Sequence, residues 1–324
     1  MNELISNGEK EIWVSIICPV YNKGEYIAQG LDSILSQKTD YSYEILVGED
    51  CSTDNSYEVL AKYEQKYPDI IHIYRRKKNL RQSRNVYDLF QKSRGKYVMI
   101  LDLDDYWSSE YKLQKQITFL EEHPEYIGVV HDFDTVNKNC EIINEGQDSR
   151  TIKDYLGREI KLEDFLENGF IFQTATLCYR NIWREDWDYS ILYTSDDTVV
   201  DLTINTMLLR RTPLFVLPES LSAYRLVIED GAANIRSVCS KDLAADFEQS
   251  TRHLYALNRF FNYEVDFSKK WEHLLKSYLQ GVLAGEDKRY RMSHFISMYN
   301  KADKRVKKRL KAEIFGKIKR KFKR

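Results

Sequence analysis

The sequence predicts an α/β fold with a mostly parallel sheet, helices on both faces of that sheet, and a helical extension at the C-terminal end. Short apolar runs with strand character alternate with segments of helical periodicity through the first hundred residues. This alternation is typical of a parallel sheet whose strands are connected by helices. Beyond about residue 226 the strand patterns stop and helical patterns continue. We therefore expect one domain over 1–225 and a helical region over 226–324.

Two periodicities predict the individual elements. Apolar and β-branched runs predict strands over 13–18, 44–47, 70–74, 97–101 and 214–217. Apolar residues that recur every three or four positions predict helices over about 24–37, 54–63, 85–92, 108–120 and 198–211. Residues 126–180 combine short strands with loops. In open sheets of this kind, ligands bind at the carboxyl ends of the strands, so residues that follow strand ends are the first candidates for a site.

Composition restricts the classes of protein to consider. With 324 residues, 43% hydrophobic and 31% charged, the chain can bury a large core, which excludes global disorder. Its five cysteines are scattered and include no C-x-x-C pair, which disfavours a disulfide framework and a zinc site. The first dozen residues contain no apolar signal region, and no apolar run approaches the length of a membrane span. We expect a cytoplasmic protein, or one at the inner face of the cell membrane.

An acidic run follows the strand predicted over 97–101. Asp102, Asp104 and Asp105 place three carboxylates within four residues, and no basic residue follows directly. Such crowded carboxylates repel one another, so a fold keeps them only where something offsets the repulsion. Oxygen ligands at an i, i+2 spacing suit a divalent cation such as Mg²⁺ or Mn²⁺, which could in turn hold a substrate diphosphate.

Two further motifs also follow strand ends. Pro19-Val20-Tyr21-Asn22 closes the first strand, and Gly48-Glu49-Asp50-Cys51-Ser52 closes the second. Together with the acidic run, and in this order, these motifs resemble the family-2 glycosyltransferases of GT-A fold over about residues 12–226. Members of that family are inverting enzymes that use nucleotide-activated sugars. The resemblance implies a GT-A-type sheet and nucleotide-sugar binding at its carboxyl edge.

The resemblance assigns nucleotide-sugar binding to the first two motifs. Pro19, Tyr21 and Asn22 are expected to hold the nucleobase and the ribose. Asp50 is the candidate to hydrogen-bond uracil or another pyrimidine. Cys51 stands where relatives usually have glycine.

The segment before the fourth strand is less similar to the family. Relatives often carry A-R-N-x-G, whereas this chain has Gln82-Ser83-Arg84-Asn85-Val86. Asn85 is carried over as a nucleotide-sugar-binding residue. Arg81 or Arg84 is a candidate to reach a phosphate, and a solvated basic loop is the alternative for either arginine.

The acidic run matches the D-x-D motif of the family. By resemblance, Asp104 is the expected direct ligand of Mn²⁺ or Mg²⁺, with Asp102 as the second candidate ligand. Asp102 is also expected to lie near the ribose or the sugar of the donor. Asp105 is expected to orient Asp104 or to face the sugar.

An inverting transfer needs a base that takes the proton of the acceptor hydroxyl. In relatives this base is an aspartate about 23 residues before a Tyr-Arg pair, and counting back from Tyr224-Arg225 reaches Asp201. Asp196 and Asp197 are the competing candidates, and a helix-capping role is the alternative for Asp201. His131 is a candidate to border the acceptor pocket, although a lone histidine is more often structural.

The C-terminal segment is strongly basic. Residues 301–324 hold 13 of the 49 Lys and Arg but only two of the 50 Asp and Glu, so the rest of the chain is acidic. Apolar residues recur every four positions in this segment, at Val306, Leu310, Ile314, Ile318 and Phe322. This pattern is typical of an interfacial helix on an anionic membrane. A helix packed on the body of the protein and a nucleic-acid-binding tail are the alternatives, and the tail lacks a nucleic-acid recognition motif.

The sequence therefore predicts a metal-dependent inverting glycosyltransferase that moves a sugar from a nucleotide donor, expected to be UDP-linked. The acceptor is expected to be a hydroxyl of a glycan or of a lipid-linked saccharide, and no nucleic-acid partner is expected. A sugar-nucleotide nucleotidyltransferase is one alternative, but the expected phosphate-binding loop contains Gly24 as its single glycine. A catalytically inactive nucleotide-sugar-binding protein is the other.

Overall fold

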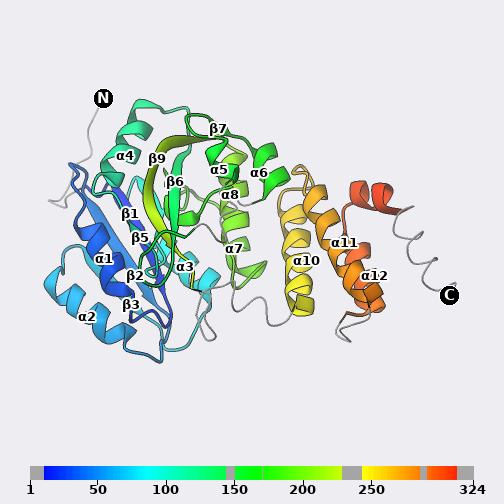
Figure 1. The fold of residues 1–324 in the computed structure, drawn as a ribbon, viewed down its shortest axis with the longest axis horizontal. Helices are drawn as coiled ribbons and strands as arrows, with labels where there is room; N and C mark the ends of the chain where they lie inside the picture. Colours follow the sequence, from blue (N-terminus) through cyan, green and yellow to red (C-terminus); the bar gives the residue numbers. More distant parts are fainter. Residues whose placement is uncertain (1–10, 144–149, 170, 228–242, 285–289, 312–324) are drawn as a thin grey trace.

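The computed structural model describes residues 11–143, 150–169, 171–227, 243–284 and 290–311. Within these residues, a nine-stranded mixed sheet is flanked by helices, and helices of the C-terminal third lie together at one side of it (Figure 1). The expected α/β class, with its mostly parallel central sheet and helical C-terminal region, is confirmed.

The strand order of the sheet is β3-β2-β1-β4-β8-β6-β9-β5, and β7 pairs with β9. The strands are β1 (Val14–Val20), β2 (Tyr43–Glu49), β3 (Ile71–Arg75), β4 (Tyr97–Ile100), β5 (Tyr106–Trp107), β6 (Gly128–Val136), β7 (Glu159–Ile160), β8 (Cys178–Arg180) and β9 (Leu214–Arg225). Strands β1 to β4 pair in parallel, whereas β8 runs antiparallel to β4 and β6. The carboxyl ends of β1, β2 and β4 therefore meet at one edge, where the three sequence motifs begin.

Strand β9 is longer than the sequence predicts. The expected strand ended at residue 217, but β9 continues past Pro218 to Arg225. Its pairing with β6 passes directly from Leu217 to Ser220. The bulge leaves Pro218 outside the ladder, so the missing N–H of the proline costs no strand hydrogen bond.

Helices cover both faces of the sheet. They are α1 (Ile27–Leu35), α2 (Ser56–Lys66), α3 (Gln82–Phe90), α4 (Lys112–Glu122), α5 (Arg150–Lys153), α6 (Leu162–Asn168), the 3₁₀ turn η1 (Thr174–Thr176), α7 (Ile191–Thr194), α8 (Asp201–Leu209), α10 (Leu243–Phe260), α11 (Ser268–Ala284) and α12 (Met292–Lys301). Neighbouring residues of β1 point to opposite faces, as strand geometry requires. Ile16 packs in the core that includes α1, α2 and α4, and Ile17 packs in the core that includes α3.

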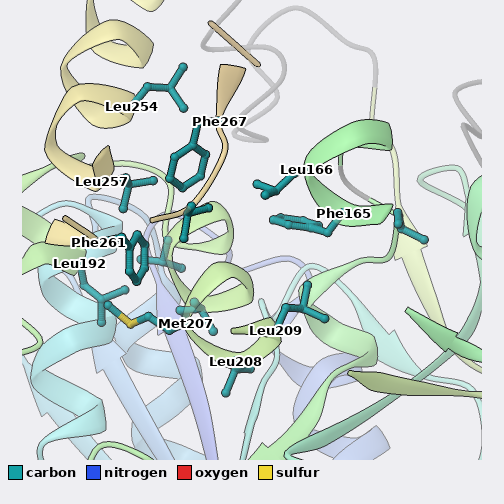
Figure 2. Close-up of a cluster of buried hydrophobic side chains, with 14 of the residues drawn as sticks. Phe165, Leu166, Leu192, Met207, Leu208, Leu209, Leu254, Leu257, Phe261 and Phe267 are labelled. Atoms are coloured by element: carbon teal, nitrogen blue, oxygen red, sulfur yellow. The ribbon is translucent and has the colours of Figure 1, made fainter. Parts of the chain in front are cut away.

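The second of these cores continues into the C-terminal helices. Figure 2 shows Phe165 of α6 and Met207 of α8 in the same buried cluster as Leu257 of α10. Trp271 of α11 and Phe295 of α12 belong to it as well. The helical region thus shares one hydrophobic core with the sheet, and the division expected at 225/226 remains a prediction.

The basic C-terminal segment is described only in part. Val306 and Leu310, the first two residues of its apolar stripe, are 0% and 2% exposed and lie in the shared core. Ile314, Ile318 and Phe322 lie outside the described residues. At least the beginning of the stripe therefore packs on the body of the protein. Of the helices that the structure describes, none combines the length and the apolar character needed to span a membrane.

Candidate active site

The first two motif loops are joined to each other at the carboxyl edge of the sheet. The Asn22 N–H donates to Ser52 Oγ (3.1 Å), and Asn22 Oδ1 accepts the Thr53 N–H (2.8 Å). The Lys23 N–H donates to Ser56 Oγ (2.9 Å). Asn22, expected to hold the nucleotide, therefore uses its amide to connect the loops.

Cys51 adopts a backbone conformation that favours glycine. Its φ is +61°, in the left-handed region that residues with a Cβ rarely occupy. A glycine at this position would adopt the turn without strain, and the cysteine adopts it as well.

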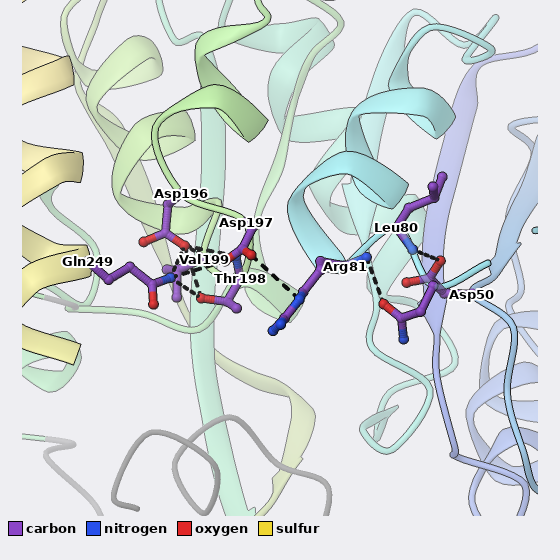
Figure 3. Close-up of polar contacts among 9 residues, drawn as sticks. Asp50, Leu80, Arg81, Asp196, Asp197, Thr198, Val199 and Gln249 are labelled. Atoms are coloured by element: carbon purple, nitrogen blue, oxygen red, sulfur yellow. Dashed lines mark hydrogen bonds and ion pairs between the residues drawn. The ribbon is translucent and has the colours of Figure 1, made fainter. Parts of the chain in front are cut away.

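Asp50 lies buried where β2 ends, with its carboxylate directed to the turn before α3. Its Oδ1 accepts the Leu80 N–H (2.7 Å), a contact drawn in Figure 3. Burial raises the pKa of Asp50, and the backbone N–H groups of Leu80 and Arg81 oppose that rise. Tyr21, by contrast, is 43% exposed at the same edge, so its ring is open to a ligand.

Asn85 is buried within α3, and both ends of its amide are bonded. Its Nδ2 donates to the Gly48 carbonyl (2.7 Å), and its Oδ1 accepts the Arg76 Nε–H (3.0 Å). The closeness of the amide also explains Gly48, because a Cβ there would lie 2.3 Å from Asn85 Oδ1. The contacts give Asn85 a part in holding α3 to the end of β2; a role as ligand stays a prediction.

The acidic run is fixed by Arg225, which the sequence analysis used only to count back to Asp201. The Arg225 N–H donates to Asp105 Oδ1 (2.8 Å), and its Nε donates to the Asp104 carbonyl (2.8 Å). Its Nη1 donates to the Lys138 carbonyl (2.9 Å). Arg225 reaches the acidic run because β9 extends beyond residue 217. The predicted strand was shorter, so the sequence did not indicate this contact.

Three carboxylates and one ammonium determine the charge of the acidic run. Lys23 forms an ion pair with Asp104. Burial, followed by the negative charge of Asp104, raises the pKa of Asp102 to about 7. Burial and then Asp104 likewise raise the pKa of Asp105 well above its usual range. Although burial lowers it, the pKa of Lys23 is raised overall, chiefly by Asp104.

Asp201 is the first residue of α8 and belongs to the same electrostatic environment. Its carboxylate accepts a hydrogen bond from the Thr174 hydroxyl of η1. Burial raises the pKa of Asp201, and the bond from Thr174 opposes that rise. The negative charge of Asp201 makes the smallest contribution to the raised pKa of Asp102, so the two carboxylates are close enough to interact electrostatically. The structure thus brings together the acids that the sequence separates by about a hundred positions.

The competing candidates for the base are engaged elsewhere (Figure 3). Asp196 Oδ1 accepts the N–H groups of Thr198 (2.8 Å) and Val199 (3.0 Å) and the Gln249 side chain (2.7 Å). Although burial opposes it, the His253 side chain, followed by the N–H groups of Thr198 and Val199, lowers the pKa of Asp196 to about 2. Asp197 pairs with Arg81 at 3.5 Å and is 55% exposed. Asp196 therefore has a structural part in fixing the turn that leads into α8, whereas Asp197 lies exposed beside it.

His131 lies away from solvent in the core. It is fully buried, its Nδ1 lies 2.6 Å from the Asp132 carbonyl, and burial lowers its pKa well below the usual range. A histidine held in the neutral form inside the core fits the structural alternative.

The residues present suit a cation that takes part of its coordination from a substrate. In the described ranges, no three His, Cys, Asp or Glu side chains gather as a complete metal site. Asp102 and Asp104 nevertheless offer hard oxygen ligands in a region that already attracts the Lys23 ammonium. Mg²⁺ commonly binds through one or two carboxylates and substrate phosphates, and the pair fits that mode.

Comparisons with known proteins show what the chain is similar to. The family model described as glycosyl transferase family 2 matches residues 15–187, more than half of the chain. The uncharacterized protein Rv1520 of Mycobacterium tuberculosis is 26% identical over 222 residues, which cover 65% of this chain and 58% of that protein. The chain thus spans less than two thirds of the length of that relative.

Two further similarities concern named transferases. The poly(ribitol-phosphate) beta-glucosyltransferase of Bacillus spizizenii is 36% identical over 104 residues, 31% of this chain and 16% of that protein. Among solved structures, residues 1–349 of S. aureus TarS in complex with UDP share the fold with a TM-score of 0.51 at 18% identity. That similarity covers 84% of this chain and 81% of the TarS chain.

We predict that Asp196→Asn destabilises the protein, because Asp196 has a structural role and is not the candidate general base. Asp196 has a lowered pKa in the fold, so its ionised form contributes stability above about pH 4, which is lost as the pH falls toward 2. Removing the charge is expected to cost on the order of 2 kcal/mol at pH 7. Urea unfolding should show this loss at pH 7 and a smaller one at pH 3.

The matched control is Asp197→Asn, which alters the exposed neighbour and is expected to change stability by less than about 0.5 kcal/mol. An Asp196→Asn protein as stable as the wild type at pH 7 would show that the hydrogen bonds around Asp196 do not favour its charged form.

Proposed function

The chain belongs to glycosyl transferase family 2, and from this membership and the acidic edge of its sheet we propose that it transfers a sugar from a nucleotide donor to an acceptor hydroxyl, with inversion. The observation that carries the proposal is the shared electrostatic environment of Asp201 and Asp102. It supports a candidate base that acts near candidate diphosphate ligands, and an inverting transfer requires such a base on the side opposite the leaving group.

A UDP-linked donor is the proposal that the site supports best. TarS, which shares the fold, has been solved with UDP and with UDP-GlcNAc. Asp50, which directly follows β2, is proposed to bond to the edge of a pyrimidine, and the exposed ring of Tyr21 is proposed to stack on the base. Asp102 and Asp105 are proposed to lie toward the ribose and the sugar, and Pro19 to shape the floor of the nucleotide site.

Asp104 and Asp102 are the residues proposed to hold Mn²⁺ or Mg²⁺. When bound, such a cation supplies charge neutralisation for the departing nucleoside diphosphate. Arg225 keeps the acidic loop in place through the Asp104 carbonyl and the Asp105 carboxylate. Preorganised charges of this kind lower the barrier because they need no rearrangement during the reaction.

Asp201 is the proposed general base. The acceptor oxygen attacks the anomeric carbon from the side opposite the diphosphate, while Asp201 takes the proton of the acceptor hydroxyl. The Thr174 hydroxyl holds the carboxylate in one orientation. The raised pKa of Asp201 makes it a better proton acceptor than an exposed aspartate.

The acceptor is proposed to be a glycan or a lipid-linked saccharide. One relative is named for poly(ribitol-phosphate), a polyol phosphate polymer, which supports an acceptor of the cell-envelope type. The match to a glycosyltransferase family model disfavours a sugar-nucleotide nucleotidyltransferase.

We predict that Asp201→Asn lowers kcat for sugar transfer by roughly 10²- to 10⁴-fold, the usual contribution of a positioned base. The substitution keeps the shape of the side chain, so stabilisation of the protein by UDP and Mn²⁺ should persist. Asp104→Ala should lose both transfer and the stabilisation that depends on Mn²⁺. Transfer assays and thermal shifts with a panel of nucleotide sugars measure these effects.

Asp197→Asn, an exposed acid four residues before Asp201, serves as the control and should transfer at the wild-type rate. A fully active Asp201→Asn would assign the base to another residue.

A second prediction concerns the pH profile. Thr174→Val removes a hydrogen bond that favours the ionised form of Asp201, so the pKa of Asp201 should rise further. The acid limb of kcat/KM should then move up by roughly one pH unit. Thr176→Val alters a neighbouring threonine that bonds to the Gln173 carbonyl, and it should leave the limb in place. Equal profiles for both variants would contradict the assignment of Asp201.

Contact with an anionic membrane is proposed to use charge rather than the whole apolar stripe. Val306 and Leu310 face the core, whereas Lys304, Lys308 and Lys311 are exposed on the same helical segment. Their spacing of four and three residues places them along one side of a helix. Such a row can bind the inner face of a membrane through its anionic lipids.

Changing Lys304, Lys308 and Lys311 together to Gln should weaken binding to phosphatidylglycerol vesicles on the order of 100-fold, from about 1 kcal/mol per lysine. Gln at three exposed lysines of the sheet domain, Lys62, Lys66 and Lys92, is the matched control. Vesicle sedimentation in low and high salt measures both; equal binding by the two triple variants would remove the lysine row as the contact.

A further inference from the structure

Lys23 is delivered to the acidic run by the loop that follows β1. Its backbone N–H donates to Ser56 Oγ (2.9 Å), and the next N–H, of Gly24, donates to Asp54 Oδ2 (3.0 Å). A Cβ at Gly24 would lie 1.9 Å from Asn55 Oδ1, so the loop passes closely over the start of α2. The backbone of Lys23 is thus held firmly, and its long side chain extends from this anchor to Asp104.

The ammonium of Lys23 occupies the place where a cation is needed. It is hydrogen-bonded to Asp104 Oδ2, and the two side chains are only 15% and 16% exposed. The charges of Asp102 and Asp105 also act on Lys23. One positive charge is thereby shared among three carboxylates, which offsets part of their mutual repulsion.

A divalent cation and the Lys23 ammonium would compete for the Asp104 carboxylate. The Asp104 oxygen that accepts a hydrogen bond from Lys23 has less electron density to offer a metal ion. Two cations on one carboxylate also repel each other strongly at low solvent exposure. Binding of a metal ion to Asp104 is therefore weakened unless the Lys23 ammonium moves away or transfers to another anion.

We propose that Lys23 is an internal counter-cation that holds the metal position of the free protein and gives it up when a nucleoside diphosphate and Mn²⁺ bind together. The inference rests on the proposed function, because the diphosphate is the anion that receives the displaced ammonium. It goes beyond that function by assigning a role to Lys23 and by predicting how the two ligands depend on each other.

Coupled binding follows from this exchange. In the free protein Mn²⁺ must displace Lys23 without compensation, so it binds weakly. A diphosphate supplies both oxygen ligands for the cation and a negative charge for the ammonium, so each ligand strengthens the other by the same factor. Removing the lysine charge should therefore strengthen the binding of Mn²⁺ alone and reduce its dependence on the nucleotide.

The test measures Mn²⁺ binding by electron paramagnetic resonance, with and without UDP, for the wild type and for Lys23→Met. Lys23→Met should bind Mn²⁺ without UDP roughly tenfold more tightly than the wild type, and UDP should add less to its affinity. The double variant Lys23→Met/Asp104→Asn should lose this gain, which locates the ion at the acidic run. Lys38→Met removes an exposed ion pair with Glu110 and should behave as wild type.

Unchanged Mn²⁺ affinity in Lys23→Met would overturn the proposal, as would the absence of Mn²⁺ binding in every variant. Thermal unfolding of each variant shows whether it is folded, and Lys23→Arg, which keeps the charge, should bind Mn²⁺ as weakly as wild type. UDP binding measured with and without Mn²⁺ tests the proposed function separately. A protein that binds no UDP would refute the nucleotide donor, while the arm with Mn²⁺ alone would still decide the role of Lys23.

Discussion

The excess negative charge of the 102–105 turn is the constraint on which the site depends. Three buried or half-buried carboxylates after one strand are unfavourable in isolation, and burial together with their mutual repulsion raises the pKa values of Asp102 and Asp105. The fold compensates in two ways. Lys23 brings a charge from the loop after β1, and Arg225 brings hydrogen-bond donors from the end of β9.

The elements around this turn can be understood as its supports. The Ser52 and Ser56 side chains hold the loop that carries Lys23. The bulge at Pro218 lets β9 continue until Arg225 reaches the acidic turn. From the C-terminal third of the chain, α10 supplies Gln249 and His253, which contact Asp196. These contacts hold the turn that leads to Asp201. The C-terminal helices thus pack in the core and also contact the turn that precedes the proposed base, Asp201.

Much of this arrangement could be predicted from the sequence. The parallel strands could be predicted because each is a short apolar run. The acids could be recognised as candidates because they directly follow such runs, at the edge of the sheet where ligands bind. Asp201 was selected as the candidate base by its distance from Tyr224-Arg225, and its role remains a proposal. The predicted sites of nucleotide and metal binding remain proposals, since the structure gives their geometry and not their occupants.

Other features depend on contacts between distant residues, which no local pattern encodes. The pairing of Lys23 with Asp104 spans 81 positions, and that of Arg225 with Asp105 spans 120. Asn22 and Asn85 have the residue type of ligands, yet their amides join loops and strands, because the neighbours that engage them come from other motifs. The length of β9 was underestimated for a similar reason, since only its partner strand reveals the bulge that accommodates Pro218.

The central claim is that acids from separate parts of the chain surround one cation-held diphosphate. A crystal structure of the full chain with UDP and Mn²⁺, with anomalous data collected for manganese, tests it directly. We expect a manganese peak between the Asp104 carboxylate and the diphosphate oxygens, at about 2.1 Å from each, with Asp201 facing the end of the diphosphate where the sugar is attached. UDP bound at another surface, or a manganese peak away from the 102–105 turn, would contradict it.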